Sequence, residues 1–242
     1  MSGLTLENVS FSYGQDTVLD RINLNIRSGE FLVLLGPSGS GKSTLLRLLA
    51  GLEAPAKGRV LQEGVPVTRA GRDRAVVFQD YSLFPWLTLT DNVALAVAKG
   101  QPQLGKADRL AVARALLVDV GLEIAAGRCP FEVSGGMRQR AAIARALALE
   151  ASVLLLDEPF GALDPINRIR LQDLLREIRL RRPRVPTTVF VTHDLDEALW
   201  LGQRVALLGA CPGHLIGEYP VPAEDRSSRD VFRRQPAVQA LR

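Results

Sequence analysis

The chain has 242 residues, of which 47% are hydrophobic, and its 30 Lys and Arg exceed its 26 Asp and Glu, which gives a formal net charge of +4. This is an ordinary globular composition, and the basic residues are scattered among acidic ones, which argues against a nucleic-acid partner. Cys129 and Cys211 lie too far apart in the sequence to indicate a disulfide framework or a zinc site. Neither a secretory signal nor an apolar run of membrane-spanning length is present, so we expect a cytosolic protein that reaches a membrane only through a partner.

The first third of the chain has the pattern of short strands. Residues 4–9 alternate loosely, and residues 18–19 and 22–26 continue this pattern, the latter with clean period-two alternation. Residues 31–35 form a continuous apolar run typical of a buried strand. Two further short strands are expected at 58–61 and 75–78. This part predicts an antiparallel β section followed by a buried central strand.

The pattern changes to helix between Ser82 and Leu149 and then alternates again. Thr90 is expected to cap a helix over 91–99, and Gly121 to close a helix over 106–120. Further helices are predicted at 136–149, 165–182 and 195–201, and further strands at 153–156, 188–191 and 205–208. Alternating strands and helices predict an α/β fold with a mainly parallel core sheet. We expect one domain over 1–242, with a helical subdomain inserted at about 82–150 and a short tail at about 220–242.

A glycine-rich loop joins the buried strand at 31–35 to a helical segment that ends at Gly51. It matches G-x-x-x-x-G-K-[ST] and is bounded by strand and helix, as the motif requires. Its backbone N–H groups and the helix N-terminus predict a phosphate site, with Lys42 on the β- and γ-phosphates and the Ser43 hydroxyl on Mg²⁺. The alternative is a glycine-rich turn without a ligand. The predicted nucleotide-binding residues here are Gly36, Pro37, Ser38, Gly39, Ser40, Gly41, Lys42, Ser43 and Thr44.

Two carboxylates follow the apolar strand at 153–156. Asp157 stands where a strand-end carboxylate holds Mg²⁺ beside a phosphate loop. Glu158 comes directly after it, and its predicted role is the general base that polarises the water attacking the γ-phosphate. The alternative is a strand that ends in two solvated acids. Together with the phosphate loop, the pair predicts hydrolysis of a bound nucleotide.

The segment from Val133 to Arg140 resembles the signature loop of the ATPases of ABC transporters. The usual form is L-S-G-G-Q, and this chain departs from it at Val133 and Met137 while retaining Ser134, Gly135 and Gly136. A serine and two glycines at a helix start form a second anion cradle. Met137 replaces a polar side chain near the expected nucleotide, so we expect altered affinity or rate without loss of function. The implied fold is an ABC-type nucleotide-binding domain of the P-loop NTPase class.

The remaining marks of the resemblance occur in the family's order. Tyr13 resembles the aromatic residue that stacks on adenine, and Gln79 resembles the glutamine that reaches Mg²⁺ and joins the core to the helical insertion. Residues 161–164 resemble the loop that crosses the dimer interface. His193 resembles the switch histidine that contacts the γ-phosphate and the attacking water. The resemblance thus implies ATP and Mg²⁺ as cofactors, with the catalytic residues Lys42, Glu158 and His193 and the metal ligands Ser43, Gln79 and Asp157.

The resemblance also implies partners. Two copies are expected to sandwich two ATP molecules head to tail, and exposed aromatics at 80–87 are expected to dock membrane permease subunits, although these aromatics are also compatible with the core of the insertion. Residues 83–88 and Pro212-Gly213-His214 resemble those of the ATPases of nitrate, sulfonate and taurine importers, and residues 227–230 and 236–242 resemble those of taurine importers. In such importers a periplasmic binding protein selects the substrate. The expected location is the cytoplasmic face of the inner membrane. Three alternatives stay open: an exporter or cell-division cassette, a soluble ABC ATPase acting on nucleic acid or the ribosome, and a clamp that binds ATP without turnover.

Overall fold

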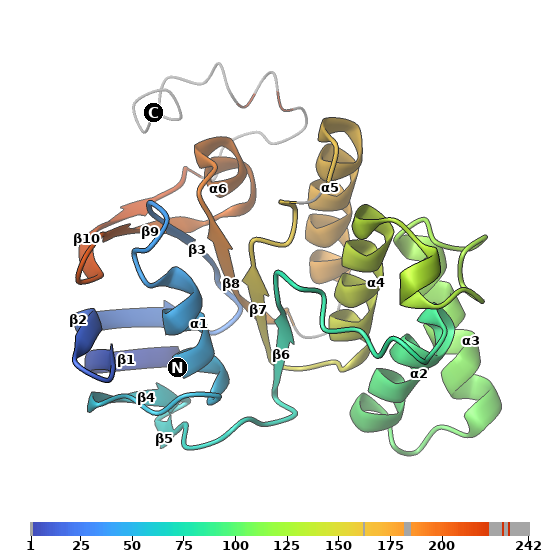
Figure 1. The fold of residues 1–242 in the computed structure, drawn as a ribbon, viewed down its shortest axis with the longest axis horizontal. Coiled ribbons are helices and arrows are strands. Elements are labelled where there is room, and N and C mark those ends of the chain that lie inside the picture. The colour runs from blue at the N-terminus through green and yellow to red at the C-terminus, as the bar shows by residue number, and fades with distance from the viewer. Residues whose placement is uncertain (1, 162, 182–184, 223–228, 230–231, 233–242) are drawn as a thin grey trace. The chain divides into compact units, whose positions relative to one another are not determined.

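The computed structural model describes residues 2–161, 163–181, 185–222, 229 and 232, and its contacts divide the chain into two compact units. Unit 1 comprises residues 1–70 and 186–242, and unit 2 comprises residues 71–185. The predicted importer-like residues 227–228, 230 and 236–242, with most of the expected tail, lie outside the described residues. The elements of each unit are labelled in Figure 1.

Unit 1 contains an antiparallel sheet with the strand order β2-β1-β4-β5. Its long hairpin consists of β1 (Ser2–Tyr13) and β2 (Asp16–Arg27), and the shorter strands are β4 (Lys57–Gln62) and β5 (Val65–Pro66). Alternate residues of β2 are buried from Ile22 to Ile26, as the period-two alternation predicts. The expected antiparallel section is therefore present, with longer strands than the sequence indicated.

A second set of strands in unit 1 has the order β10-β9-β3-β8. The central β3 (Phe31–Leu35) is parallel to both β8 (Thr187–Thr192) and β9 (Arg204–Gly209), whereas β10 (His214–Pro220) is antiparallel to β9. All residues of β8 and the first four of β3 are buried, which explains their continuous apolar sequences. This parallel core aligns the carboxyl ends of β3, β8 and β9.

Two helices of unit 1 pack against these strands. Helix α1 (Lys42–Ala50) packs against β8, and α6 (Leu195–Leu201) packs against β3 and β8. Helix α1 ends at Gly51, whose φ of +72° allows the left-handed C-cap that glycine favours. The helix predicted after the glycine-rich loop is thus confirmed, with its first turn at Lys42.

Unit 2 contains a parallel strand pair and four α-helices among its described residues. Strand β6 (Arg74–Val77) pairs with β7 (Val153–Asp157), and α5 (Pro165–Arg181) begins at the predicted residue, a proline, which is favoured in the first turn of a helix. The helices that lie between these two strands in the sequence pack against one another and appear in green and yellow-green in Figure 1. They are α2 (Leu89–Gly100), α3 (Lys106–Asp119) and α4 (Gly135–Ala148), with a short 3-10 helix at Pro130–Glu132.

One helix boundary predicted from the sequence is wrong. Thr88, rather than Thr90, is the N-cap of α2: its hydroxyl accepts a hydrogen bond from the Asp91 N–H at 3.0 Å. Thr90 is already helical and buried, and its hydroxyl donates to the Ala126 carbonyl oxygen at 2.8 Å. The error arose because both threonines precede an acidic residue in the first turn, and only tertiary packing distinguishes them.

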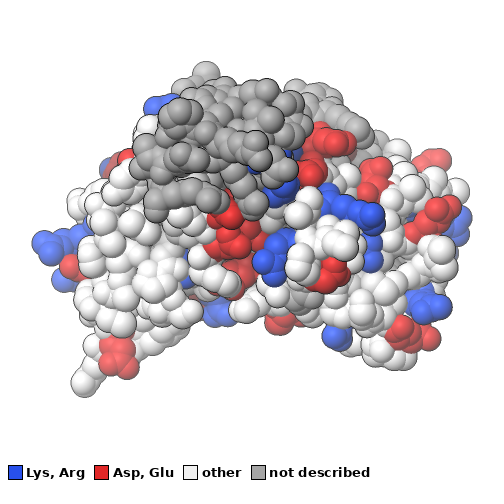
Figure 2. Space-filling model, turned by 90° about the horizontal axis from the view of Figure 1, so that it is seen from above, with Lys and Arg blue, Asp and Glu red and all other residues white. Residues whose placement is uncertain are grey.

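The surface charges and the helix lengths bear on possible partners. On the face shown in Figure 2, Lys and Arg side chains lie among Asp and Glu side chains. In the part of the chain that the structure describes, every helix is too short or too polar to cross a lipid bilayer.

Candidate functional site

The loop from β3 to α1 has the backbone geometry that its glycines permit. Gly39 and Gly41 adopt φ values of +79° and +80°, in the left-handed region that disfavours other residues. A Cβ on Gly41 would lie 2.6 Å from Leu19 Cδ2, and one on Gly36 would lie 2.6 Å from the Leu208 carbonyl oxygen. A Cβ on Gly36 would thus collide with backbone and one on Gly41 would displace the Leu19 side chain, so the loop fits closely against β2 and β9.

Lys42 sits inside the curl of this loop. Its side chain is almost fully buried, at 6% exposed, and Nζ donates to the carbonyl oxygens of Gly36 and Pro37, both at 2.8 Å. The ammonium group is thus held beside the loop backbone and close to the start of α1, where the N–H groups of the first turn have no acceptor within the helix. Positive charge and N–H groups converge there, as a phosphate site requires.

Ser40 supplies a further polar group to the loop. Its side chain is fully buried, and its hydroxyl has no hydrogen-bond partner among the described residues. A buried hydroxyl without a partner is uncommon and costs free energy, so a ligand that accepts from it would be favoured. The glycine contacts, the Lys42 ammonium and this hydroxyl all fit a bound phosphate.

The turn between β9 and β10 packs against the glycine-rich loop and β2, a contact that the sequence did not predict. The Gly213 N–H donates to the Val18 carbonyl oxygen at 2.8 Å, and its own carbonyl oxygen accepts from the Asp20 N–H at 2.9 Å. A Cβ at this position would lie 2.2 Å from the Ser40 carbonyl oxygen. The sequence singled out Pro212-Gly213-His214 only as a resemblance to certain importers, and glycine after proline was the one available signal.

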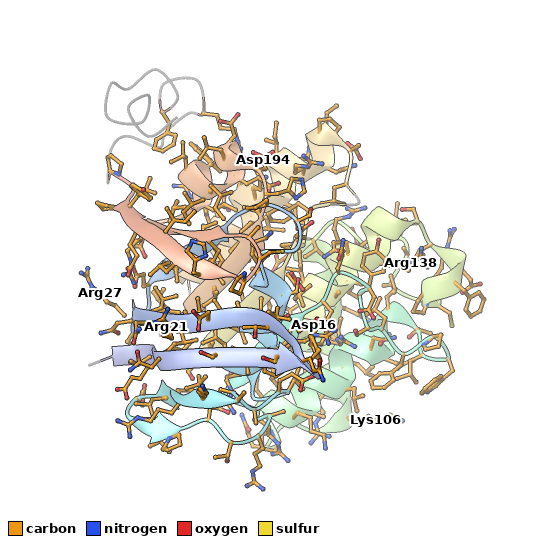
Figure 3. All side chains as sticks on the ribbon, turned by 60° about the vertical axis from the view of Figure 1, so that its left-hand side comes forward. Asp16, Arg21, Arg27, Lys106, Arg138 and Asp194 are labelled. Atoms are coloured by element: carbon orange, nitrogen blue, oxygen red, sulfur yellow. The ribbon has the colours of Figure 1, made fainter. Side chains whose placement is uncertain are left out.

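His193 follows the carboxyl end of β8, next to the end of β3. Leu35 and Thr192 are register partners, so the chain enters the glycine-rich loop and the His193 turn at neighbouring positions. His193 is exposed, and its neighbours fix the backbone: the Thr192 hydroxyl donates to Glu197 Oε2 at 2.7 Å and accepts from the Asp194 N–H at 3.0 Å. Asp194, labelled in Figure 3, then caps α6. The structure thus brings His193 and the phosphate loop to one edge of unit 1.

Tyr13 lies at the end of the β1–β2 hairpin, opposite Asp16. Its side chain is 47% exposed, and its ring stands edge-on to Phe11 with a centroid separation of 4.8 Å and an interplanar angle of 85°. The same hairpin contributes Leu19 to the contact with Gly41. Tyr13 therefore presents aromatic surface to solvent from the strand pair that flanks the phosphate loop.

The predicted acidic residues lie in unit 2, at the carboxyl end of β7. Asp157 is buried as the last residue of that strand, and Glu158 is half-buried with a φ of +43° that turns the chain away from the strand direction. Because Val77 and Leu156 are parallel register partners, β6 ends beside β7, and the exposed Gln79 follows two residues later. The structure thus brings Gln79, Asp157 and Glu158 to one edge of unit 2.

Ser134 caps α4, which begins with the two glycines of the predicted signature loop. Its hydroxyl accepts from the Met137 N–H at 3.3 Å. Met137 also lines a hollow of about 380 Å³ with apolar residues that include Leu122 and Ile124. The departure from the family pattern at Met137 is therefore accommodated by apolar neighbours within unit 2.

Residues 161–164 lead into α5, although Ala162 lies outside the described residues. The Asp164 carboxylate accepts the Asn167 N–H at 3.0 Å and the Asn167 side-chain amide at 2.6 Å. These two hydrogen bonds, the backbone one first, hold the pKa of Asp164 below its ordinary value. The carboxylate therefore acts as the cap of α5 and orders the turn that precedes it.

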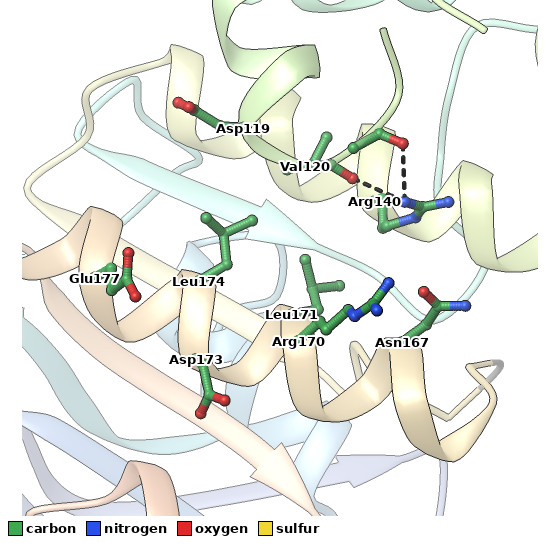
Figure 4. A pocket seen from close by; sticks show the side chains of 10 residues that line it. Asp119, Val120, Arg140, Asn167, Arg170, Leu171, Asp173, Leu174 and Glu177 are labelled. Carbon is green, nitrogen blue, oxygen red and sulfur yellow. Dashed lines mark hydrogen bonds between the residues drawn. The ribbon is translucent and has the colours of Figure 1, made fainter. Parts of the chain in front are cut away.

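A hollow of about 410 Å³ lies between the end of α3, α4 and α5 (Figure 4). Arg140 dominates one wall, where Nη1 donates to the carbonyl oxygens of Val120 and Gly121, both at 3.0 Å. Burial lowers the pKa of Arg140, and the charge of Asp164 opposes that shift. Acidic residues and arginines share the lining, so neither sign of charge predominates. The hydrogen bonds of Arg140 instead join the end of α3 to α4. The lining consists of Asp119, Val120, Gly121, Arg140, Asn167, Arg170, Leu171, Asp173, Leu174 and Glu177.

The loop before α2 exposes aromatic side chains, as predicted. Trp86 is 73% exposed and packs against Phe84, with ring centroids 5.5 Å apart. Asn92, fully buried in α2, holds this loop: Oδ1 accepts from the Phe84 N–H, and Nδ2 donates to the carbonyl oxygens of Phe84, Leu87 and Thr88. A rigid backbone therefore presents Trp86 to solvent.

The predicted metal ligands are divided between the units, with Ser43 in unit 1 and Gln79 and Asp157 in unit 2. Among the described residues, His, Cys, Asp and Glu form no group of three or more that is arranged to hold a metal ion. The predicted set contains a single carboxylate. It thus fits an ion such as Mg²⁺ that keeps waters and substrate phosphates among its ligands.

Comparison with known protein families agrees with the resemblance drawn from the motifs. A family model described as ABC transporter matches residues 19–161. Among solved structures, the dimeric post-hydrolysis structure of the ATP-binding cassette MJ0796, bound to ADP and Pi, has a TM-score of 0.81 and 33% identity, and the alignment covers 91% of this chain and 100% of that one.

Three relatives illustrate the range of similar proteins. The bicarbonate transport ATP-binding protein CmpC of Synechococcus elongatus is 46% identical over 99% of this chain, which spans only 37% of the length of CmpC. The bicarbonate transport ATP-binding protein CmpD of Synechocystis is 43% identical, over 99% of this chain and 86% of CmpD. The nitrate import ATP-binding protein NrtD of Synechococcus elongatus is 42% identical, over 95% of this chain and 83% of NrtD.

Proposed function

Because this chain belongs to the ABC transporter family, we propose that it is the ATP-hydrolysing subunit of a bacterial importer of a small anion. The observation that carries this proposal is the phosphate loop with Lys42, whose ammonium group is fixed by two loop carbonyl oxygens beside the start of α1. The three relatives described above are ATP-binding proteins of bicarbonate or nitrate transport. The fold class proposed from the sequence, an ABC-type α/β domain, is shared with the MJ0796 cassette.

In this proposal the residues of unit 1 bind the nucleotide. Lys42 and the loop N–H groups hold the β- and γ-phosphates, and the Ser40 hydroxyl donates to a phosphate oxygen. Tyr13 stacks on the adenine ring with the face that its contact with Phe11 leaves exposed. His193 contacts the γ-phosphate and the attacking water.

The residues of unit 2 supply the hydrolytic groups and the contact with a second copy. Glu158 polarises the attacking water, and Asp157 and Gln79 join Ser43 as ligands of Mg²⁺, which neutralises phosphate charge when bound. Ser134, Gly135 and Gly136 bind the nucleotide held by the second copy. ATP thereby joins two subunits, and its hydrolysis releases them.

The exposed Phe84–Trp86 loop is the proposed contact with the permease. A large aromatic residue on a rigid backbone loses little entropy on binding, which suits an interface anchor. Through that contact the chain would lie at the cytoplasmic face of the inner membrane, with a periplasmic binding protein delivering the substrate to the permease.

The transported molecule is proposed at two levels. The broader level is a small anion, which the nitrate and bicarbonate relatives support. The narrower level includes sulfonates and taurine, which rest on the resemblance at residues 83–88 and Pro212-Gly213-His214. The binding protein and permease select among nitrate, bicarbonate, taurine and alkanesulfonates, so transport has to be measured with the assembled system.

The ATPase part of the proposal is tested with Glu158→Gln. This variant is expected to bind ATP as the unchanged protein does but to accumulate as a closed dimer, because the water is no longer polarised. Size-exclusion chromatography with light scattering, with and without ATP, measures the dimer, and phosphate release measures turnover. Glu123→Gln, an exposed carboxylate outside the proposed site, is the matched control. Normal turnover in Glu158→Gln would contradict the role of Glu158, and ATP binding without turnover in the unchanged protein would favour the clamp.

The transport part is tested by capturing the tagged protein from detergent-solubilised membranes and identifying the copurifying chains by mass. We expect a multi-span permease, and Trp86→Ala is expected to reduce its recovery while ATP binding persists. Uptake of labelled nitrate, bicarbonate and taurine by cells that contain the whole system then identifies the substrate. Recovery of only soluble or nucleic-acid-bound partners would contradict the importer proposal, and outward transport would favour an exporter.

A further inference from the structure

The segment that follows Gln79 is fastened to helix α4. Arg145, on the third turn of α4, donates from Nη1 to the Ser82 carbonyl oxygen and from Nη2 to the Tyr81 carbonyl oxygen, the latter at 3.4 Å. Its guanidinium group is half-buried, and burial lowers its pKa while the charge of Asp80 opposes the shift. One cation on α4 therefore holds two consecutive backbone carbonyl groups.

The backbone of this segment is strained where Arg145 binds it. Tyr81 and Ser82 adopt φ values of +67° and +45°, a conformation uncommon for residues other than glycine. Two adjacent residues of this kind persist only when surrounding contacts over-determine them, and such strain gathers at functional segments. The Arg145 hydrogen bonds provide part of that restraint.

Tyr81 also reaches the start of α4 through its side chain. The Arg138 guanidinium, labelled in Figure 3 near the start of α4, lies 5.3 Å from the centroid of the Tyr81 ring, within the range of a cation–π contact. A Cβ on Gly135 would lie 3.2 Å from the Tyr81 hydroxyl oxygen, so the phenol end of the ring borders the signature glycines. Tyr81 thus contacts the first turn of α4 through its side chain and the third turn through its backbone carbonyl oxygen.

The same segment continues into the aromatic loop that Asn92 holds. The Tyr81 N–H donates to the Phe78 carbonyl oxygen at 3.2 Å, and the Phe84 N–H donates to Asn92 Oδ1 at 2.8 Å. Only Ser82 and Leu83 lie between Tyr81 and Phe84, the residue held by Asn92. A displacement of the aromatic loop should therefore move Tyr81 as well. The loop proposed to meet the permease is therefore linked mechanically to the helix that carries Ser134.

We propose that Tyr81 is a positioning residue that holds Ser134, Gly135 and Gly136 in the orientation needed to bind the nucleotide of a second copy. The inference rests on the proposed function, because it requires an ATP-joined dimer. Tyr81 touches neither the nucleotide nor the water in this account, and it acts through Arg138 and the backbone of α4. Its loss should consequently weaken ATP-driven dimerisation and leave nucleotide binding by the monomer intact.

The test uses the full chain carrying Glu158→Gln, so that hydrolysis does not consume the dimer. Adding Tyr81→Ala is expected to raise the dimer dissociation constant at saturating ATP by about tenfold in sedimentation velocity, and Tyr81→Phe, which keeps the ring over Arg138, by about threefold or less. The affinity of the monomer for a fluorescent ADP analogue should stay within about twofold in each case. Tyr219→Ala removes an exposed tyrosine of unit 1 and serves as the control.

A double variant distinguishes positioning from general destabilisation. Arg138→Ala and Tyr81→Ala are expected to be non-additive in the dimer constant, because each removes the same contact. The inference would be overturned by additive effects or by an unchanged dimer dissociation constant in Tyr81→Ala. It would also be overturned if dimerisation and the monomer's affinity for the ADP analogue fell equally, together with the melting temperature. A Glu158→Gln parent that stays monomeric with ATP would overturn the proposed function as well, which separates the two failures.

Discussion

The Lys42 Nζ lies 2.8 Å from the carbonyl oxygen of Gly36, the first residue of the loop that Lys42 itself closes. The side chain folds back over six residues of its own chain and is almost completely buried. This arrangement places a positive charge inside a ring of backbone, where two carbonyl oxygens of the loop hold it. Such preorganisation lowers the entropic cost of binding a phosphate.

Replacing Lys42 by alanine is expected to weaken ATP binding by about 3 kcal/mol, or roughly 100-fold, because a buried charged partner of the phosphates is lost. Isothermal titration calorimetry at fixed Mg²⁺ measures the change. Lys99→Ala, which removes an exposed lysine of α2, should bind ATP as tightly as the unchanged protein. Tight ATP binding by Lys42→Ala would contradict the assignment of the phosphate loop.

Adding a methyl group at Gly213, in the turn between β9 and β10, is expected to displace the backbone of the phosphate loop. A Cβ there would lie 2.2 Å from the Ser40 carbonyl oxygen, so backbone must move, with a destabilisation of about 1–3 kcal/mol. Gly213→Ala should therefore lower both the melting temperature and the affinity for ATP. Gly127→Ala is the control, since a Cβ at Gly127 has no neighbour within 4 Å. Unchanged ATP affinity in Gly213→Ala would show that the loop does not depend on the β9–β10 turn.

The sequence predicted the elements whose signals are local. Continuous apolar runs identified β3, β7 and β8, and Pro165 and Ser134 marked the starts of α5 and α4. The resemblance to ABC transporter ATPases is confirmed by the match over residues 19–161. The motif residues have local patterns that identify them in the sequence alone, and their individual roles remain predictions.

What the sequence did not predict depends on contacts between distant segments. Gly213 supports the phosphate loop at Ser40, which lies 173 positions earlier in the sequence, and no periodic pattern in the sequence indicates this contact. The contact of Arg145 with Tyr81 joins a helix to a loop 64 residues earlier. The Thr88 cap was missed because Thr90 offers the same chemistry, and burial alone decides between them.

Asn92 is expected to be a strong determinant of the aromatic loop. Asn92→Ala removes the partner of the Phe84 N–H and the side-chain hydrogen bond to the Leu87 carbonyl oxygen, whereas the carbonyl oxygens of Phe84 and Thr88 keep the backbone N–H groups of Leu87 and residue 92. The free energy of unfolding should therefore fall by about 1–3 kcal/mol. Hydrogen exchange at the Phe84 amide, with thermal unfolding, measures the loss. Asn25→Ala, at an exposed position of β2, is the control. If the Phe84 amide stayed protected in Asn92→Ala, the loop would have to be held by other contacts.

The Asp164 carboxylate should make α5 sensitive to acid. The hydrogen bonds from Asn167 favour the charged form, so the pKa in the folded state lies below that in the unfolded chain. Stability from this group is therefore present above the ordinary range of an aspartate and is lost as the pH falls through the lowered pKa of the folded state. Asn167→Ala removes the side-chain bond and keeps the backbone bond, so we expect the Asp164 pKa to rise part of the way toward its ordinary value.

A carbon-detected NMR titration of the Asp164 carboxyl group measures this shift directly. Ile166→Ala is a suitable control, because Ile166 contributes a backbone N–H that the substitution preserves. The control should keep the lowered pKa, whereas Asn167→Ala should move the acid-induced loss of stability to higher pH. Identical titration curves for the two variants would show that the Asn167 amide does not stabilise the carboxylate. The turn at 163–164 would then owe its order to the backbone hydrogen bonds alone.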